Sequence, residues 1–479
     1  MCDRVFEECA ALSKVSFTAD SALTRIGTSA FAKSGIAAFV APGSLLDIGD
    51  EAFADCASLT AAELPKELKA IGRGCFARTG LVQLAVPQAI VELKDGTFED
   101  CAALAGVEFA ADSQLTRICV RAFANSGLEA FVAPAALRSL GFEAFKGCSK
   151  LKTAELCTEM NEIGTGCFAN SGLERVHLPA RIYQIDQSVF EGCASLRTVS
   201  LADGAEAIMA GWLRCDSVEE VLVPRSVRVI QEDAFRDWKN LRQITFPEDS
   251  QLEEIGSRAF QGAGLESFTA PAGLREIASN AFCRCEQLKH VTLNEGLTRL
   301  TWESFRQSGL EELTVPATVV EIAPFAFLDC VGLHRISFAE NSKLEKIGFR
   351  AFQGAGLEDF IAPAKLREIQ QGVFCECRHL KTAKLPEGLT TIAGLCFYES
   401  GLTEIAIPQS VQTIEHHAFW GCSSLASVAF AAESALQAIG EMAFAYSGLR
   451  TMSIPVNTKI MASAFDEGFQ LKYTNGQVV

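Results

Sequence analysis

Cysteine is the residue type with the widest chemistry in this chain, which contains 18 cysteines among 479 residues. Half of them share one slot, three residues after a recurring phenylalanine, in alternate copies of a repeat. A disulfide needs Cα atoms about 4.4–6.8 Å apart, whereas stacked alternate repeats hold neighbouring cysteines about 10 Å apart. We therefore predict small buried residues whose thiols donate weak hydrogen bonds to turn carbonyls. The nine cysteines of this slot are Cys9, Cys56, Cys101, Cys148, Cys193, Cys285, Cys330, Cys377 and Cys422, and Trp238 fills the remaining position.

Two Cys-x-Cys pairs invite a zinc hypothesis, and they are Cys283 with Cys285 and Cys375 with Cys377. The pairs lie four repeats apart, about 19 Å in a stack, so they cannot share one ion. A site combining the second pair with His379 and Cys396 is a weaker alternative, since Cys396 lies on the other side of its phenylalanine. Zinc requires converging ligands, so we predict no metal site and no cofactor.

The adjacent pair His416 and His417 follows Glu415, which raises the question of acid–base chemistry. Neighbouring side chains on irregular backbone usually diverge, and the other four histidines are scattered singly, so a solvated turn is the better interpretation. The sequence contains no Gly-x-Ser-x-Gly, phosphate-binding loop or His-Glu-x-x-His motif. We predict no catalytic residues and no enzymatic activity.

Composition narrows the function classes further. The formal net charge is −17 and no basic run occurs, which argues against a nucleic-acid partner. No stretch of 18 or more apolar residues exists, so no membrane insertion is expected. Phenylalanine is used 33 times against four Trp and four Tyr, which indicates one core position of fixed shape, used repeatedly.

A near-constant phenylalanine spacing shows that the chain is a repeat array. The series runs from Phe6 to Phe465 with Leu213 in one position, which gives about 21 repeats of 21–25 residues. Two kinds of unit alternate along the chain, one reading F-x-x-C-x-x-L and the other most often reading F-x-x-S-G-L. A two-residue insertion recurs at Phe17, Phe109, Phe246, Phe338 and Phe430, and its spacing of 92 or 137 residues suggests growth by duplication of four-repeat blocks.

Each unit continues as L-x-x-h-x-h, often closed by proline, where h is apolar. This alternation predicts a short strand, and the following Ile-Gly-x-x-Ala-Phe spacing suits a helical turn or an irregular return. Stacked units then bury a continuous core and pair their strands in a parallel sheet. We predict a solenoid with a parallel β-sheet on one face and irregular or short helical returns on the other. It forms a single array over 1–479, with repeats over about 5–471 and a degenerate C-terminal end over about 455–479.

These units resemble the BspA-like leucine-rich repeats of bacterial and protist surface antigens. The match is close at Phe419-Trp420-Gly421-Cys422-Ser423-Ser424-Leu425 and at Ile439-Gly440-Glu441-Met442-Ala443-Phe444. The resemblance implies a leucine-rich-repeat solenoid and, more loosely, adhesion or the binding of host or extracellular proteins at a cell surface. An intracellular structural scaffold is the alternative.

A partner surface is expected where strand side chains point outward. The outward row four residues after each strand leucine is mostly small and weakly charged, which suits a shallow protein- or peptide-binding face; keeping a long sheet soluble is an equally good explanation. The outward side chains depart most from the repeat pattern near the centre of the chain. We predict that Arg175, His177, Glu220 and Leu222 belong to a partner footprint.

The two ends bear on assembly and localisation. The first repeat begins at Val5-Phe6 with little before it, although solenoids usually need polar caps. Either the chain is a fragment or this uncapped N-terminal edge meets another molecule, with end-to-end self-association as one form. The polar tail over 472–477 would cap the other end. No signal peptide or Asn-x-Ser/Thr sequon is visible, which suggests a cytoplasmic protein or a fragment, whereas the family resemblance suggests the cell surface.

Overall fold

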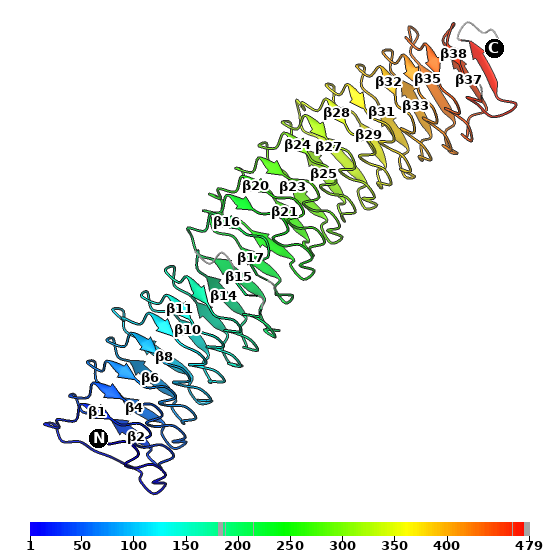
Figure 1. Ribbon diagram of the computed structural model, residues 1–479. Coiled ribbons are helices and arrows are strands. Elements are labelled where there is room, and N and C mark those ends of the chain that lie inside the picture. The colour runs from blue at the N-terminus through cyan, green and yellow to red at the C-terminus, as the bar shows by residue number, and fades with distance from the viewer. Residues whose placement is uncertain (181–184, 187, 214, 462, 474–479) are drawn as a thin grey trace. The chain divides into compact units, whose positions relative to one another are not determined.

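The computed structural model describes residues 1–180, 185, 186, 188–213, 215–461 and 463–473. They group into two compact units, a first unit of Met1–Glu206 with Gly211–Pro224 and a second of Ala207–Ala210 with Arg225–Val479. The strands of each unit follow one another in chain order (Figure 1). Each unit is a stack of similar turns, and the single array over 1–479 stays a prediction. Of the polar tail, only Lys472 and Tyr473 lie within the described residues, in a terminal strand.

The first unit contains two sets of parallel strands. Its longer strands are β2 (Ala38–Val40), β4 (Ala61–Glu63), β6 (Gln83–Val86), β8 (Gly106–Phe109), β10 (Ala130–Val132), β12 (Thr153–Glu155), β14 (Arg175–Leu178), β15 (Thr198–Leu201) and β17 (Glu220–Leu222). They pair as β2-β4, β6-β8 and β10-β12-β14-β15-β17. The two-residue strands β1 (Arg25–Ile26), β3 (Asp47–Ile48) and β5 (Ala70–Ile71) form one ladder, and β7 (Glu92–Leu93), β9 (Arg117–Ile118), β11 (Ser139–Leu140) and β13 (Glu162–Ile163) form another.

The second unit repeats this arrangement. Its longer strands are β19 (Gln243–Thr245), β21 (Ser267–Thr269), β23 (His290–Thr292), β25 (Glu312–Val315), β27 (Arg335–Phe338), β29 (Asp359–Ile361), β31 (Thr382–Lys384), β33 (Glu404–Ile407), β35 (Ser427–Phe430), β37 (Thr451–Ile454) and β39 (Gln470–Tyr473). They pair as β21-β23-β25-β27, β29-β31-β33-β35 and β37-β39. The two-residue strands are β16 (Ala207–Ile208), β18 (Val229–Ile230), β20 (Glu254–Ile255), β22 (Glu276–Ile277), β24 (Arg299–Leu300), β26 (Glu321–Ile322), β28 (Lys346–Ile347), β30 (Glu368–Ile369), β32 (Thr391–Ile392), β34 (Thr413–Ile414), β36 (Ala438–Ile439) and β38 (Lys459–Ile460).

These strands confirm the predicted parallel β-solenoid. In β6, for example, Leu84 and Val86 are buried while Gln83 and Ala85 are exposed, and Pro87 follows the strand. Proline lacks the N–H that would continue the ladder, so the strand ends there. The period-two alternation therefore fixes which side chains enter the core and which remain available on the surface.

The segment around each repeated phenylalanine contains no helix within the described ranges, so the prediction of short helical returns is wrong. Residues two before and two after the phenylalanine adopt left-handed backbone, as at Glu51 (φ 56°) and Asp55 (φ 60°). Two such residues in five interrupt the right-handed run that an α-helix requires. The turn amides bond to the neighbouring repeat instead, and Phe31 N–H donates to the Ala52 carbonyl at 2.8 Å.

The repeated phenylalanines form the core of each unit, as their spacing predicts. Their rings stack nearly parallel, with centroids 5.1 Å apart between Phe31 and Phe53 and 5.2 Å apart between Phe260 and Phe282. All four of these side chains are fully buried, and burying each contributes roughly 1.5–3 kcal/mol. In the irregular repeat, Leu213 takes this position and is buried as well.

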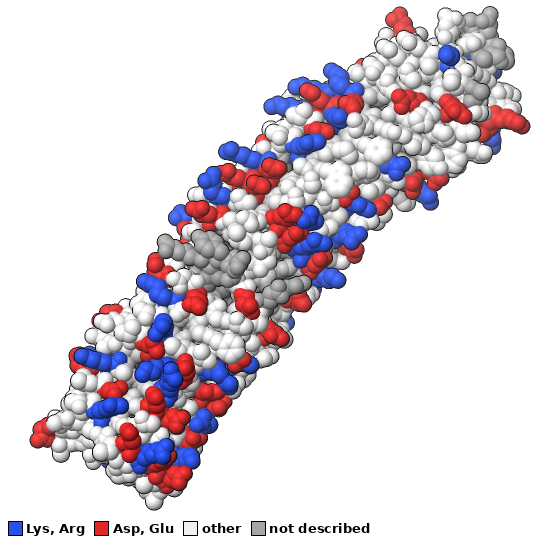
Figure 2. Space-filling model, in the orientation of Figure 1, with Lys and Arg blue, Asp and Glu red and all other residues white. Residues whose placement is uncertain are grey.

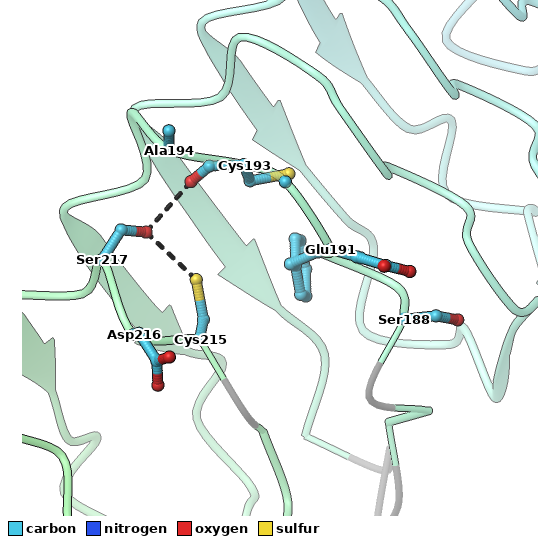
Figure 3. Close-up of a pocket in the computed structure, with 9 residues that line it drawn as sticks. Ser188, Glu191, Cys193, Ala194, Cys215, Asp216 and Ser217 are labelled. Carbon is cyan, nitrogen blue, oxygen red and sulfur yellow. Dashed lines mark hydrogen bonds between the residues drawn. The ribbon is translucent and has the colours of Figure 1, made fainter.

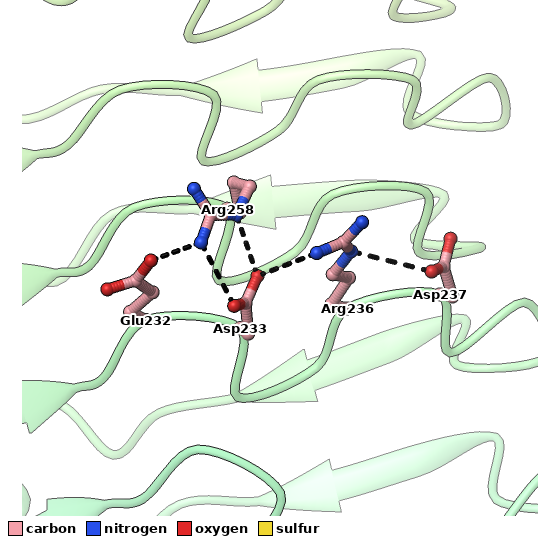
Figure 4. Close-up of polar contacts among 5 residues, drawn as sticks. All are labelled: Glu232, Asp233, Arg236, Asp237 and Arg258. Atoms are coloured by element: carbon pink, nitrogen blue, oxygen red, sulfur yellow. Dashed lines mark hydrogen bonds and ion pairs between the residues drawn. The ribbon is translucent and has the colours of Figure 1, made fainter.

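Charged side chains on the turns pair between neighbouring repeats. In the second unit, Arg258 Nε lies 2.9 Å from Asp233 Oδ1, and the same guanidinium contacts Glu232 (Figure 4). Arg236 reaches the Asp233 carboxylate at 3.5 Å and that of Asp237 at 3.6 Å. The Arg258 hydrogen bond is the main reason that the pKa of Asp233 is lowered. Acidic and basic groups are interspersed over the face shown in Figure 2.

Candidate functional site

The four residues of the predicted footprint all lie in the first unit, on outward positions of neighbouring strands. In β14, Arg175 and His177 alternate with buried Val176 and Leu178. In β17, Glu220 and Leu222 flank buried Val221. The structure therefore places all four on the same sheet face, and their contact with a partner stays a prediction.

Strand β15 lies between β14 and β17 and aligns these residues in two columns. The parallel register pairs Arg175 with Thr198 and Thr198 with Glu220. The second column runs from His177 through Ser200 to Leu222. Adjacent strands lie about 4.8 Å apart, so six outward side chains occupy one continuous area.

Hydrogen bonds across the strands hold part of this area in place. His177 Nδ1 lies 2.9 Å from Ser200 Oγ, and Thr198 Oγ1 donates to Glu220 Oε2 at 3.3 Å. Leu222 leaves 37% of its side chain exposed beside them. Sequence reasoning omitted Thr198 and Ser200 from the footprint, although both occupy the same outward positions of the intervening repeat.

A separate hollow lies on the turns of the same unit, where the sequence departs from the repeat (Figure 3). Regular repeats place a glycine against the preceding cysteine carbonyl, but here Ser217 Oγ donates to the Cys193 carbonyl at 3.0 Å. Cys215 Sγ lies 3.2 Å from the same hydroxyl. The hollow is also lined by Glu191 and Asp216, and the described residues of its lining include no histidine to act as the usual base for a serine or cysteine nucleophile.

The structure confirms the predicted role of the cysteine slot. Cys148 Sγ donates to the Phe123 carbonyl at 3.0 Å and lies 3.3 Å from Ser126 Oγ of the preceding Ser-Gly unit. Burial raises the pKa of the Cys148 thiol to about 11. All 18 cysteines are free. Cys9 is the exception to the prediction of burial, because it is exposed in the first repeat, where no earlier phenylalanine carbonyl lies against it.

The second cysteine of each Cys-x-Cys pair is held in the core by the same kind of hydrogen bond as Cys148. Cys285 and Cys377 donate to the carbonyls of Phe260 and Phe352, both at 3.0 Å. Burial raises the pKa of Cys375 to about 12, so the thiolate that zinc requires is disfavoured. Over the described ranges, no group of three or more His, Cys, Asp and Glu side chains converges closely enough to hold a metal ion.

The histidine pair belongs to a turn that is held by backbone contacts. Glu415 Oε2 accepts a hydrogen bond from the Gly394 N–H at 2.8 Å, so its carboxylate is used structurally. The rings of His416 and His417 are nearly perpendicular, with centroids 5.8 Å apart. His416 is exposed and packs over Gly394, where an added Cβ would come within 2.7 Å of its ring. This arrangement fits the predicted turn.

Comparisons with known proteins agree with the repeat pattern. A family model described as "BspA type Leucine rich repeat region (6 copies)" matches residues 1–105, 116–214, 212–334 and 345–472. No curated protein matches the chain. No helix in the described part is long and apolar enough to cross a membrane.

Several solved structures are similar at low sequence identity. A leucine-rich repeat protein from Bacteroides ovatus is 19% identical over 94% of this chain and 87% of its own, with a TM-score of 0.30. A leucine rich cell surface protein from Faecalibacterium prausnitzii is 20% identical over 80% and 82%, with a TM-score of 0.29. The pneumococcal vaccine antigen PcpA is 15% identical over 88% of each chain, with a TM-score of 0.30. At these scores the fold assignment depends on the family match and on the repeats themselves.

Proposed function

Because the chain belongs to the BspA-type leucine-rich repeat family, we propose that it binds a partner protein through the outward face of its longer strands and has no catalytic role. Stacked repeats of this kind expose an extended, rigid surface that is suited to protein recognition. The strand face offers outward side chains at regular intervals, whereas the described residues that line the hollow on the turns include no histidine. The proposal therefore assigns recognition to the strands and stability to the turns.

One observation carries this proposal: outward side chains of several chemical types lie close to the least regular repeat, in which Leu213 takes the phenylalanine position. Arg175, His177, Glu220 and Leu222 supply a cation, an imidazole, a carboxylate and an aliphatic group within three adjacent strands. Protein interfaces combine such groups, with apolar contacts for affinity and polar contacts for orientation.

Alanine replacement of these four residues together tests the proposed footprint. Wild-type protein and the variant would be immobilised and compared for capture of extracellular host proteins and, separately, of proteins from a cell lysate. The control variant replaces Arg335, Asp359 and Ile361, which are outward residues of β27 and β29 in the second unit. Loss of a captured protein with the first variant only supports the footprint, and unchanged capture would sink it.

We propose adhesion at the cell surface as the setting, since the family is associated with that location. An intracellular scaffold is the second candidate, favoured by the 18 free cysteines, because unpaired thiols are typical of reducing compartments. Surface biotinylation of intact native cells separates the two. Strong labelling of this chain supports the adhesin, and no labelling beside a labelled surface control supports the scaffold.

A further inference from the structure

A second stretch of the strand face, covering β2 to β12 of the first unit, has an unusual charge pattern. Its outward residues include no Lys, Arg or His and no Asp. The charged members are glutamates only, and the others are small or aliphatic except for the uncharged Gln83. The outward positions are Ala38 and Val40, Ala61 and Glu63, Gln83 and Ala85, Gly106 and Glu108, Ala130 and Val132, and Thr153 and Glu155.

The glutamates of this stretch, Glu63, Glu108 and Glu155, are exposed and occupy the same column on β4, β8 and β12. Among the described residues, no ion pair or hydrogen bond involves their carboxylates. Some acidic groups elsewhere in the first unit are paired, as in the contact between Lys152 Nζ and Glu174 Oε1 at 2.6 Å. Three unpaired carboxylates along one face therefore present a negative field that a cationic partner would neutralise.

Between the glutamates, the same column carries apolar side chains on the intervening strands. Val40 is 55% exposed and Val132 is 60% exposed, and Ala85 lies between them in sequence on β6. Strands β4 and β6, and likewise β8 and β10, belong to separate ladders, but backbone hydrogen bonds join the residues that lead into them. Val82 N–H donates to the Thr60 carbonyl at 3.3 Å, and Glu129 N–H donates to that of Ala105 at 3.2 Å.

The column thus alternates an apolar side chain and a carboxylate on successive strands, about 4.8 Å apart, with each type repeating about every 10 Å. An α-helix rises about 1.5 Å per residue, so residues three apart are about 4.5 Å apart along its axis and residues seven apart about 10.5 Å. A modest tilt of the helix axis relative to the column shortens its seven-residue spacing of about 10.5 Å toward the column repeat of about 10 Å.

We infer that this face, Val40-Glu63-Ala85-Glu108-Val132-Glu155, binds an amphipathic helix of a partner protein with an apolar residue at one heptad position and Lys or Arg three residues later. Each apolar side chain would lie against Val40, Ala85 or Val132, and each cation against the following glutamate. About 18 residues of helix would span the six strands.

The spacing disfavours an extended occupant. Side chains of a β-strand return to one face every two residues, or about 6.6 Å, which matches neither period of the column. A polyproline helix repeats about every 9.3 Å, but it has no residue on the same face halfway between. The α-helix is the regular chain conformation that supplies both spacings on one side.

The test uses the whole chain and fluorescence anisotropy with a labelled 21-residue peptide. The peptide carries Leu and Arg three residues apart in each of three heptads, with Ala and Gln elsewhere. We expect saturable binding that weakens with added salt, and at least tenfold weaker binding of a peptide with the same composition in scrambled order. A version containing a central proline should also bind at least tenfold more weakly, because proline interrupts the helix.

The protein variant for this test is Glu63→Gln/Glu108→Gln/Glu155→Gln, which should lose at least tenfold in affinity. The matched control, Glu67→Gln/Asp112→Asn/Glu159→Gln, removes the same charge from exposed loops that follow the same three strands, and should stay within about twofold. In a charge swap, lysine at the three face positions should restore binding to a peptide with Glu in place of Arg.

Equal binding by both triple variants, equal binding of the scrambled or proline peptides, or failure of the charge swap would overturn the inference. The inference rests on the proposed protein-binding function of the strand face, but the helix-binding column and the proposed footprint are tested by different variants and can fail separately. Alanine replacement of Arg175, His177, Glu220 and Leu222 tests the footprint and leaves the column from Val40 to Glu155 intact.

Discussion

At the scale of single residues, the alternation of Cys and Ser-Gly units has a packing explanation. Each slot cysteine with a Ser-Gly unit before it meets a phenylalanine carbonyl and, in most cases, a serine hydroxyl, as Cys56 meets Phe31 at 2.9 Å and Ser34 at 3.5 Å. The glycine after that serine is required because the preceding repeat approaches so closely. The cysteines are therefore structural residues, and their number does not indicate redox chemistry.

Replacing one of these glycines tests the close approach. A Cβ at Gly172 would lie 2.1 Å from the Ser149 carbonyl oxygen, so we expect Gly172→Ala to destabilise the protein by about 1–3 kcal/mol. Gly106 has no atom within 4 Å of such a Cβ. Gly106→Ala should therefore be neutral or slightly stabilising. Urea denaturation of both variants gives the comparison, and equal midpoints would contradict the packing account.

The buried thiols predict instability in alkali. Burial raises the pKa of Cys148, Cys330 and Cys422 to about 11 in the folded protein, whereas an unfolded thiol titrates near 8.5. The unfolded state thus loses protons first, so the stabilisation is complete below about pH 8.5 and is lost as the pH rises toward 11. Urea midpoints measured from pH 7 to pH 10.5 should fall.

Other groups also titrate in this range, so a variant provides the control. Cys148→Ala/Cys330→Ala/Cys422→Ala removes three of the thiols with raised pKa values. Its urea midpoint should start lower and then fall less steeply with pH than that of the wild type. A variant slope equal to the wild-type slope would show that these thiols do not cause the alkaline effect.

At the scale of the structural element, the strand and the phenylalanine stack were predictable from the sequence, but the turn was not. Alternating burial and a closing proline are strong local signals, as in β6. The Ile-Gly-x-x-Ala-Phe spacing of three and four fits a helical turn equally well. Its left-handed positions hold Gly in some repeats, such as Gly74, and residues as different as Glu51 and Arg78 in others, so no single residue type marks them. Contacts with the next repeat decide the conformation, and single-sequence patterns do not report such contacts.

The phenylalanine stack predicts a large cost for one truncated ring. Phe282 is fully buried, with its ring 5.2 Å from that of Phe260 and 5.4 Å from that of Phe305. Phe282→Ala should reduce stability by about 3–5 kcal/mol. Phe142 is 47% exposed and outside the stack, so Phe142→Ala should cost far less. Guanidinium denaturation measures both, and an unchanged midpoint for Phe282→Ala would refute the role of the stack.

At the scale of the whole molecule, the repeats follow the longer block predicted from sequence. Phe39, Phe131, Phe268 and Phe360 are spaced by 92, 137 and 92 residues. Each packs its tilted ring against the phenylalanine of the next repeat at 4.6–4.8 Å. The same internal packing in separate blocks supports growth by duplication. Side chains facing outward are free of that packing, so recognition can change there without loss of the fold.

The candidate site could be predicted only in part from the sequence. Strand alternation placed Arg175, His177, Glu220 and Leu222 on one face, and the structure agrees. The hydrogen bond between His177 and Ser200 and the column from Val40 to Glu155 depend on the register between strands, which is set by turn geometry. Partner identity depends on a second molecule, so no pattern within this chain specifies it.

The most direct test of protein binding by the strand face is hydroxyl-radical footprinting of the chain alone and with a partner that it captures. The account predicts protection of His177 and Leu222 on β14 and β17, with unchanged labelling of Trp420 and Tyr446 on the turns of the second unit. Protection confined to those turn residues, with His177 and Leu222 still fully labelled, would contradict it.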